Sequence, residues 1–191
     1  KINLKNNENL EKICKGINLI IHLAGMNAKE CIDNPKKASE VNVKGTENLL
    51  NAAIKNGVKR FVYLSSIHVY DNSGSDNLYE HSDRKSFHPY ALSKIAAENI
   101  VMSANKTSDI EVVIVRLSNA VGLPHHPDVN CWMLLANDLC YQVVNQKKII
   151  LRESGGKEKR NFISIRQTIK AIEHLINLPV EKLGDGVFNV G

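Results

Sequence analysis

The sequence predicts an α/β fold built on a doubly wound parallel sheet. Short apolar runs, typical of strands buried on both faces, alternate along the chain with longer segments of helical periodicity. Alternation of this kind joins parallel strands by helical crossovers that cover both faces of the sheet. The chain has 191 residues, 43% of them hydrophobic, which is enough for one domain with a substantial core.

The first half of the chain begins with short elements and ends with a long helix. Pro35 favours a helix start, because its fixed φ suits the first turn, and Gly57 favours a helix end. Asp, Asn, Ser and Gly are frequent at 71–87, before the helix at 88–106, which favours a loop there. The expected elements are a helix at 7–15, a strand at 18–24, a helix at 35–56, a strand at 60–65, a loop at 71–87 and a helix at 88–106.

The second half repeats the alternation with shorter strands. Its most apolar run is EVVIVRL at 111–117, which predicts a buried strand. A Gly/Pro/His-rich loop and a charged loop interrupt the pattern. The expected elements are a strand at 111–117, a loop at 122–130, a helix at 131–146, a strand at 148–151, a loop at 152–160, a strand at 161–165, a helix at 166–178 and a strand at 187–190.

Composition narrows the classes of function. The net charge is +5, but the lysines and arginines are scattered, which favours a solvated surface over a nucleic-acid or membrane-binding face. A mildly basic surface also suits an anionic small substrate. The four cysteines show neither a Cys-x-x-Cys motif nor zinc spacing, so we expect reduced thiols, no metal site and a cytoplasmic protein. No apolar run reaches the roughly 18 residues of a membrane helix.

The segment at 61–94 carries the chemistry. Tyr90 and Lys94 lie four residues apart and so share one face of a helix, and Ser65 and Ser66 end the preceding strand. A nearby ammonium lowers the pKa of a phenol, which then exchanges a proton with a hydroxyl during hydride transfer to a nicotinamide. The alternative is a half-buried tyrosine, a surface lysine and serines that cap the strand. For Ser65, the sequence favours a role in the site and a role as a strand cap equally.

Eight strings in order carry a resemblance to a known family. They resemble the nucleotide-sugar epimerase/dehydratase group of the extended short-chain dehydrogenases/reductases, whose fold is Rossmann-like. The resemblance covers nearly the whole chain and implies a nicotinamide cofactor and a nucleotide-sugar substrate. The strings are HLAG (22–25), NVKGTENLL (42–50), GVKRFVYLSS (57–66), VY (69–70), PYALSK (89–94), RLSNAVG (116–122), RNFISI (160–165) and FNVG (188–191).

The resemblance assigns roles residue by residue. It implies that Tyr90 is the acid/base, that Lys94 tunes Tyr90 and binds the nicotinamide ribose, and that Ser66 hydrogen-bonds the substrate. For His22 a hydrogen-bonded core histidine is the better reading, and Gly45 is expected at a helix contact. The remaining residues fall into two groups, a cofactor group of Leu23, Ala24, Gly25, Asn42, Ser65, Tyr90, Lys94 and Leu117 and a substrate group of Ser66, His68, Asn119 and Arg160. Arg160 has the alternative of a surface residue in a charged loop.

Departures from the family pattern narrow the activity. Dehydratases of this group carry an Asp-Glu pair after the catalytic hydroxyl residue, and decarboxylating relatives keep the glutamate, whereas this chain has Ile67-His68. Asn161 stands where an aspartate usually follows Arg160. We therefore expect a 4-epimerase with NAD as cofactor. An NAD(P)H-dependent 4-keto-sugar reductase and a non-catalytic binding module are the alternatives, and NADP stays open.

The glycine-rich turn of dinucleotide-binding sheets has no counterpart in this sequence. We expect that about 55–60 residues of the natural domain, two strand–helix units, precede it, and that the domain also continues past GVFNVG. Residues 1–121 would then be the C-terminal part of the cofactor-binding domain, and residues 122–191 a substrate lobe interleaved with returning elements. Such a piece should have an open sheet edge, bind the cofactor poorly and be marginally stable. The resemblance also implies a homodimer through the helices at 35–56 and 88–106.

Overall fold

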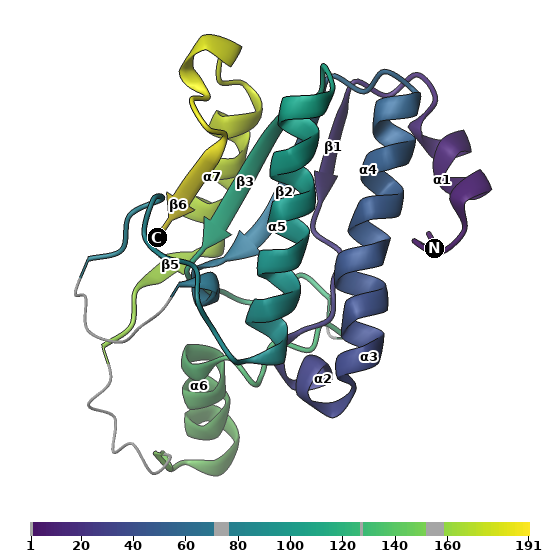
Figure 1. Cartoon of the computed structure of the whole chain (residues 1–191). Helices are drawn as coiled ribbons and strands as arrows, with labels where there is room; N and C mark the ends of the chain where they lie inside the picture. The colour runs from purple at the N-terminus through teal and green to yellow at the C-terminus, as the bar shows by residue number, and fades with distance from the viewer. Residues whose placement is uncertain (1, 71–76, 127, 152–158) are drawn as a thin grey trace.

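The main sheet has four parallel strands in the order β1-β2-β3-β6. The computed structural model describes residues 2–70, 77–126, 128–151 and 159–191 (Figure 1). The predicted doubly wound α/β fold is confirmed. Its strands are β1 (Leu19–His22), β2 (Arg60–Ser66), β3 (Glu111–Leu117) and β6 (Val187–Val190).

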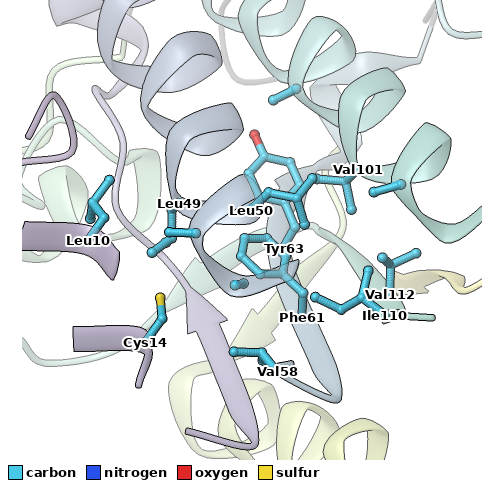
Figure 2. Packing of buried hydrophobic residues seen from close by; sticks show 14 of the residues in the cluster. Leu10, Cys14, Leu49, Leu50, Val58, Phe61, Tyr63, Val101, Ile110 and Val112 are labelled. Carbon is cyan, nitrogen blue, oxygen red and sulfur yellow. The ribbon is translucent and has the colours of Figure 1, made fainter. Parts of the chain in front are cut away.

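Helices cover both faces of this sheet (Figure 1). On one face lie α1 (Asn7–Cys14), α4 (Gly45–Lys55) and α5 (Pro89–Thr107), and on the other lies α7 (Ile165–Ile176). Side chains alternate along β2, so that Phe61 and Tyr63 enter the core beneath α4 and α5 (Figure 2), whereas Val62 packs in the core on the α7 side. None of the helices in the described ranges is long and apolar enough to cross a membrane.

The connection from β1 to α4 is more broken than predicted. The helix expected at 35–56 is present as three consecutive segments, α3 (Pro35–Ala38), the π-helical η1 (Ser39–Lys44) and α4. A further helix, α2 (Ala28–Asp33), precedes them and was not predicted. A capping box of Asn27 and Glu30 starts α2, so the signal was present in the sequence.

The segment after β3 departs most from prediction. The predicted strand at 148–151 is wrong, because these residues are not in a strand and Ile149, Ile150 and Leu151 are each more than half exposed. The helix predicted from residue 131 begins only at Leu135, as α6 (Leu135–Gln146). A short strand that was not predicted, β4 (Asn119–Val121), pairs in parallel with β5 (Phe162–Ser164). Two single 3-10 turns complete the described elements, η2 (Ile67–Val69) and η3 (Val180–Lys182).

Strand β1 stands at one edge of the main sheet. The prediction that this strand is buried on both faces is wrong, since Ile21 is 41% exposed and Leu23, just after the strand, is 56% exposed. An apolar cleft of about 930 Å³ runs beside β1 and is lined in part by Ile20, Ile21 and Leu49. Among the described residues β1 pairs only with β2, so its other side presents unpaired backbone groups.

Candidate functional site

The predicted chemical residues meet where β2 ends and α5 begins. Ser66 is the last residue of β2, and Tyr90 is the second residue of α5. The start of α5 is fixed by Pro89 in its first turn and by His88, whose Nδ1 accepts a hydrogen bond from the Tyr90 backbone N–H at 3.1 Å. The carboxyl end of a parallel sheet is where open α/β folds bind ligands.

Three side chains form the centre of this site. Tyr90 is hydrogen-bonded to the Ser66 hydroxyl. Lys94 lies one turn further along α5 and is 6% exposed. Its Nζ donates to the backbone oxygen of Leu64 at 2.9 Å and stands 5.8 Å from the centre of the Tyr90 ring. The structure thus brings Ser66, Tyr90 and Lys94 together, as the sequence predicted.

Burial is the main cause of the shifted pKa values of Lys94 and Tyr90. It lowers the pKa of Lys94 to about 8. It also raises the pKa of Tyr90, an effect that the hydrogen bond from Ser66 opposes. The expectation that Lys94 lowers the pKa of Tyr90 is therefore not met in this arrangement. The reason is the direction of Nζ, which is bonded to Leu64 and lies closer to the Tyr63 ring, at 4.9 Å, than to the Tyr90 ring.

A small pocket of about 180 Å³ opens beside Lys94. A Cβ added at Gly25 would stand 3.1 Å from Asn42 Oδ1 and 3.7 Å from Lys94 Nζ, so a side chain there would fill the space in front of the ammonium. Lys94 keeps donors for a ligand, because one Nζ hydrogen bond is to Leu64. These features fit the ribose and ring of a nicotinamide nucleotide. Of the predicted cofactor group, the lining residues are Leu23, Gly25, Ser65, Tyr90 and Lys94.

The other members of the predicted cofactor group lie outside this pocket. Asn42 is 1% exposed and holds the loop after β1, since its Oδ1 accepts from the Met26 N–H at 2.7 Å and its Nδ2 donates to Ser93 Oγ at 3.0 Å. Ala24 lines the larger cleft beside β1. Leu117 packs against the core on the α7 side.

The predicted substrate residues other than Ser66 lie in three segments, of which the one with His68 contacts Tyr90. The ring of His68 meets the Tyr90 ring edge-on at 6.4 Å, and its pKa is lowered by partial burial and by the charges of His88 and Arg160. Asn119, in β4, donates through Nδ2 to the backbone oxygen of Asn161 at 2.9 Å. This hydrogen bond joins β4 to the segment that carries Arg160, whose guanidinium is exposed and donates to the Lys159 oxygen at 3.0 Å.

His22 is a core residue, as predicted. It is 3% exposed, and its Nε2 lies 2.9 Å from Thr46 Oγ1. Burial, together with the charge of Lys94, lowers its pKa to about 4, so it is neutral near pH 7. Gly45, expected at a helix contact, instead packs against the turn before α1, because a Cβ there would stand 3.1 Å from Leu4.

Sequence reasoning missed a buried charged pair beside the site. Glu98, on α5, is fully buried, and it is bonded to Arg116 of β3, which is 2% exposed. Two signals could have found the pair. Arg116 interrupts an otherwise apolar strand, where a charge needs a partner, and Glu98 follows Lys94 by four residues on the same helix face.

Comparisons with known proteins agree with the fold and the motifs. The family model described as "NAD dependent epimerase/dehydratase family" matches residues 1–191. A dTDP-D-glucose 4,6-dehydratase of Dictyostelium discoideum is 31% identical over 208 residues, which cover 100% of this chain and 45% of that protein. A putative UDP-glucose 4-epimerase of Methanocaldococcus jannaschii is 27% identical, with 93% of this chain and 56% of that protein covered.

Solved structures show the same fold. A UDP-N-acetylglucosamine 4-epimerase from Methanobrevibacter ruminantium superposes with a TM-score of 0.87 at 24% identity, covering 100% of this chain and 60% of that one. The chain therefore spans about half the length of the relatives that it matches. Because the family model matches its whole length, the chain belongs to the NAD dependent epimerase/dehydratase family.

Proposed function

We propose that the protein is an NAD-dependent epimerase that acts on a nucleotide-activated sugar. The observation that carries the proposal is the meeting of Ser66, Tyr90 and Lys94 where β2 ends and α5 begins, with Tyr90 and Lys94 lining one small pocket. A hydroxyl, a phenol and an ammonium in that arrangement can move one proton to and from a substrate hydroxyl. Relatives named as epimerases and as dehydratases act on nucleotide sugars, which supports the substrate class.

The proposed mechanism gives each side chain one task. A bound nicotinamide would supply the acceptor and donor of a hydride. Tyr90 accepts the proton of a sugar hydroxyl when its carbon is oxidised, and returns it when the carbon is reduced on the other face. Ser66, bonded to Tyr90, holds the same substrate oxygen. Lys94 would donate to the nicotinamide ribose through the Nζ hydrogens that are not bonded to Leu64.

The site favours epimerisation over water elimination. Elimination needs an additional acid to protonate the leaving hydroxyl and a base to remove a carbon-bound proton. No Asp or Glu is among the described residues that line the pocket at Tyr90. The residues directly after Ser66 are Ile67 and His68, and His68 faces Tyr90 with its ring. These observations support an enzyme with a single acid/base group.

The remaining parts of the proposal concern substrate and assembly. We propose that residues 122–191 include the substrate lobe and that Arg160 binds a substrate phosphate, which suits the forked donors of a guanidinium. His68 and Asn119 would contact the same substrate. We also propose a homodimer through α4 and α5, which lie side by side on one face of the sheet (Figure 1), in a cytoplasmic enzyme with free thiols.

The test uses the complete protein as its gene encodes it. It is incubated with UDP-, dTDP- and GDP-sugars, first without added cofactor and then with NADH or NADPH, and the products are separated by chromatography. Interconversion of 4-epimers without added reductant is the expected result. Stoichiometric consumption of NAD(P)H would indicate the reductase instead, and formation of a 4-keto-6-deoxy sugar would indicate a dehydratase.

A matched variant ties any activity to the site. Tyr90→Phe keeps the ring and removes the proton-transferring hydroxyl, so turnover should fall by about 10²–10⁴-fold while NAD affinity stays within a few-fold. Tyr141→Phe, on α6, removes a hydroxyl from a 43% exposed ring and is the control. Equal activity of Tyr90→Phe and wild type would contradict the proposed acid/base role.

A further inference from the structure

The carboxylate of Glu98 is the centre of a buried polar network. It accepts hydrogen bonds from Arg116 Nη2 at 2.8 Å, from Arg84 Nη1 at 3.0 Å and from the Ser65 hydroxyl. Glu98 is fully buried, whereas Arg84 is partly exposed. Burying a carboxylate with its counter-ions costs free energy that apolar packing would not, so a role beyond stability accounts better for its presence.

The network reaches the loop after β2 and the last strand. Arg116 Nη1 donates to the Tyr70 hydroxyl at 2.6 Å and to the backbone oxygen of Glu80 at 2.8 Å. The Tyr70 hydroxyl in turn donates to Asn189 Oδ1, in β6, at 2.6 Å. Glu98 and Arg116 thereby fix α5, β2, β3 and β6 relative to one another.

Glu98 is linked to the proton-transfer residues by two short paths. Along α5 it lies one turn beyond Lys94, on the same face. Across the sheet its hydrogen-bond partner Ser65 lies between Leu64, whose backbone oxygen accepts from Lys94 Nζ, and Ser66, which is bonded to Tyr90. A shift of Ser65 would therefore move both partners of the catalytic pair.

We propose that Glu98 is a positioning residue for the site: it holds the end of β2 against α5 through Ser65 and places a negative charge, paired with Arg116 and Arg84, near Lys94. The proposal rests on the proposed function, because its importance for turnover presumes that Tyr90 and Lys94 transfer a proton. Its structural and electrostatic parts can be measured without turnover.

The charges around Lys94 support this assignment. Burial lowers the pKa of Lys94 to about 8, and Cys31 and Glu98 act in the opposite direction. The other titratable groups near Lys94 carry no charge near pH 7. The pKa values of Cys31 on α2 and of Tyr90 are raised by burial, that of Tyr63 on β2 is raised as well, and that of His22 on β1 is about 4. Glu98, which is paired with Arg116 and Arg84, is therefore the acidic group that acts against the effect of burial on the pKa of Lys94.

The first experiment measures Lys94 directly. The complete protein without cofactor is labelled competitively with acetic anhydride from pH 6 to pH 11, and peptide mass spectrometry gives the midpoint at which Lys94 becomes reactive. Glu98→Gln keeps the side-chain shape and removes the charge, so the midpoint should fall by roughly one pH unit, as expected for a charge one helical turn away. Arg84→Gln removes a cation beside Glu98, and the midpoint should rise by a few tenths of a unit.

Opposite shifts in the two variants support the proposal, because a network that only stabilises the fold would leave both midpoints unchanged. Unchanged midpoints, within about 0.2 pH unit, overturn it. If Glu98→Gln does not fold, Arg84→Gln tests the proposal alone. A rise in the labelling midpoint of Lys94 supports it, and an unchanged midpoint overturns it. Where nucleotide-sugar turnover is found, the basic limb of its pH profile should move with the labelling midpoint. Shifted labelling without turnover would leave the role of Glu98 standing and refute the proposed function instead.

Discussion

Removal of the Asn42 side chain should loosen the loop that follows β1. Asn42 is 1% exposed, and its amide contacts both backbone groups of Met26, at 2.7 Å to the nitrogen and 3.3 Å to the oxygen. It also donates to Ser93 Oγ at 3.0 Å. These contacts join η1, the loop at 24–27 and α5.

The expected cost follows from what Asn42→Ala leaves behind. The Met26 N–H loses its acceptor, and an unpaired backbone donor out of water costs about 1–3 kcal/mol. Met26 is partly buried, which places this term in the lower half of that range. The lost side-chain volume adds about 1 kcal/mol. Ser93 Oγ keeps its own bond to the Tyr90 oxygen, so we expect a total loss of about 2–3 kcal/mol.

Urea unfolding of the complete protein measures this loss, with Asn145→Ala as the matched control. Asn145 makes a comparable hydrogen bond, from Nδ2 to the Tyr141 oxygen at 2.9 Å, but it is exposed, so its removal should cost less than about 0.5 kcal/mol. Affinity for NAD should fall only in Asn42→Ala, because Gly25 and Met26 line the small pocket. Equal unfolding free energies for the two variants would refute the reasoning.

Two further predictions concern stability. Gly186→Ala should destabilise the protein by at least about 2 kcal/mol in urea unfolding, because φ is +73° and the new Cβ would lie 2.4 Å from the Val112 oxygen; Gly57→Ala, with φ +69° and open space, should cost only about 1 kcal/mol, and an equal loss would argue against the clash. His22 has a folded pKa of about 4 and an unfolded pKa near 6.5, so its contribution is complete above pH 6.5 and is lost as the pH falls toward 4. This amounts to roughly 3 kcal/mol, and His22→Gln should lose less stability than wild type between pH 7.5 and pH 4.5. A titration of the His22 ring by NMR with a midpoint near 6.5 would contradict this prediction.

Local patterns predicted most of the fold. The apolar run at 111–117 is β3, and the strand expected at 187–190 is β6, with both bounds correct. The failures are short segments. Residues 148–151 include Ile149, Ile150 and Leu151 but are not in a strand, and an apolar run of three residues carries no periodicity that would reveal this. Strand β4 has three residues and exists because β5 lies beside it.

The candidate site could likewise be predicted from the sequence only in part. The spacing of Tyr90 and Lys94 places both on one helix face in any α-helix, and the apolar strand before them located Ser65 and Ser66, of which the family resemblance selected Ser66. Asn42 was expected to face the cofactor, but its burial and its hydrogen bonds to Met26 depend on contacts across 16 residues of chain. No local pattern encodes such a contact.

The sequence by itself determined the class of fold, the order of its main elements and the shared helix face of Tyr90 and Lys94, because periodicity and spacing act over one or two turns of chain. Only the tertiary structure decided the rest. The pKa of Tyr90 is raised rather than lowered because burial outweighs a lysine whose Nζ is bonded to Leu64. Glu98 and Arg116 are 18 residues apart in the chain and form an ion pair in the core because folding brings them within 2.8 Å. The pKa of a side chain, its burial and its ion-pair partner depend on distances through space. Those distances are fixed only when the sheet and its helices have packed.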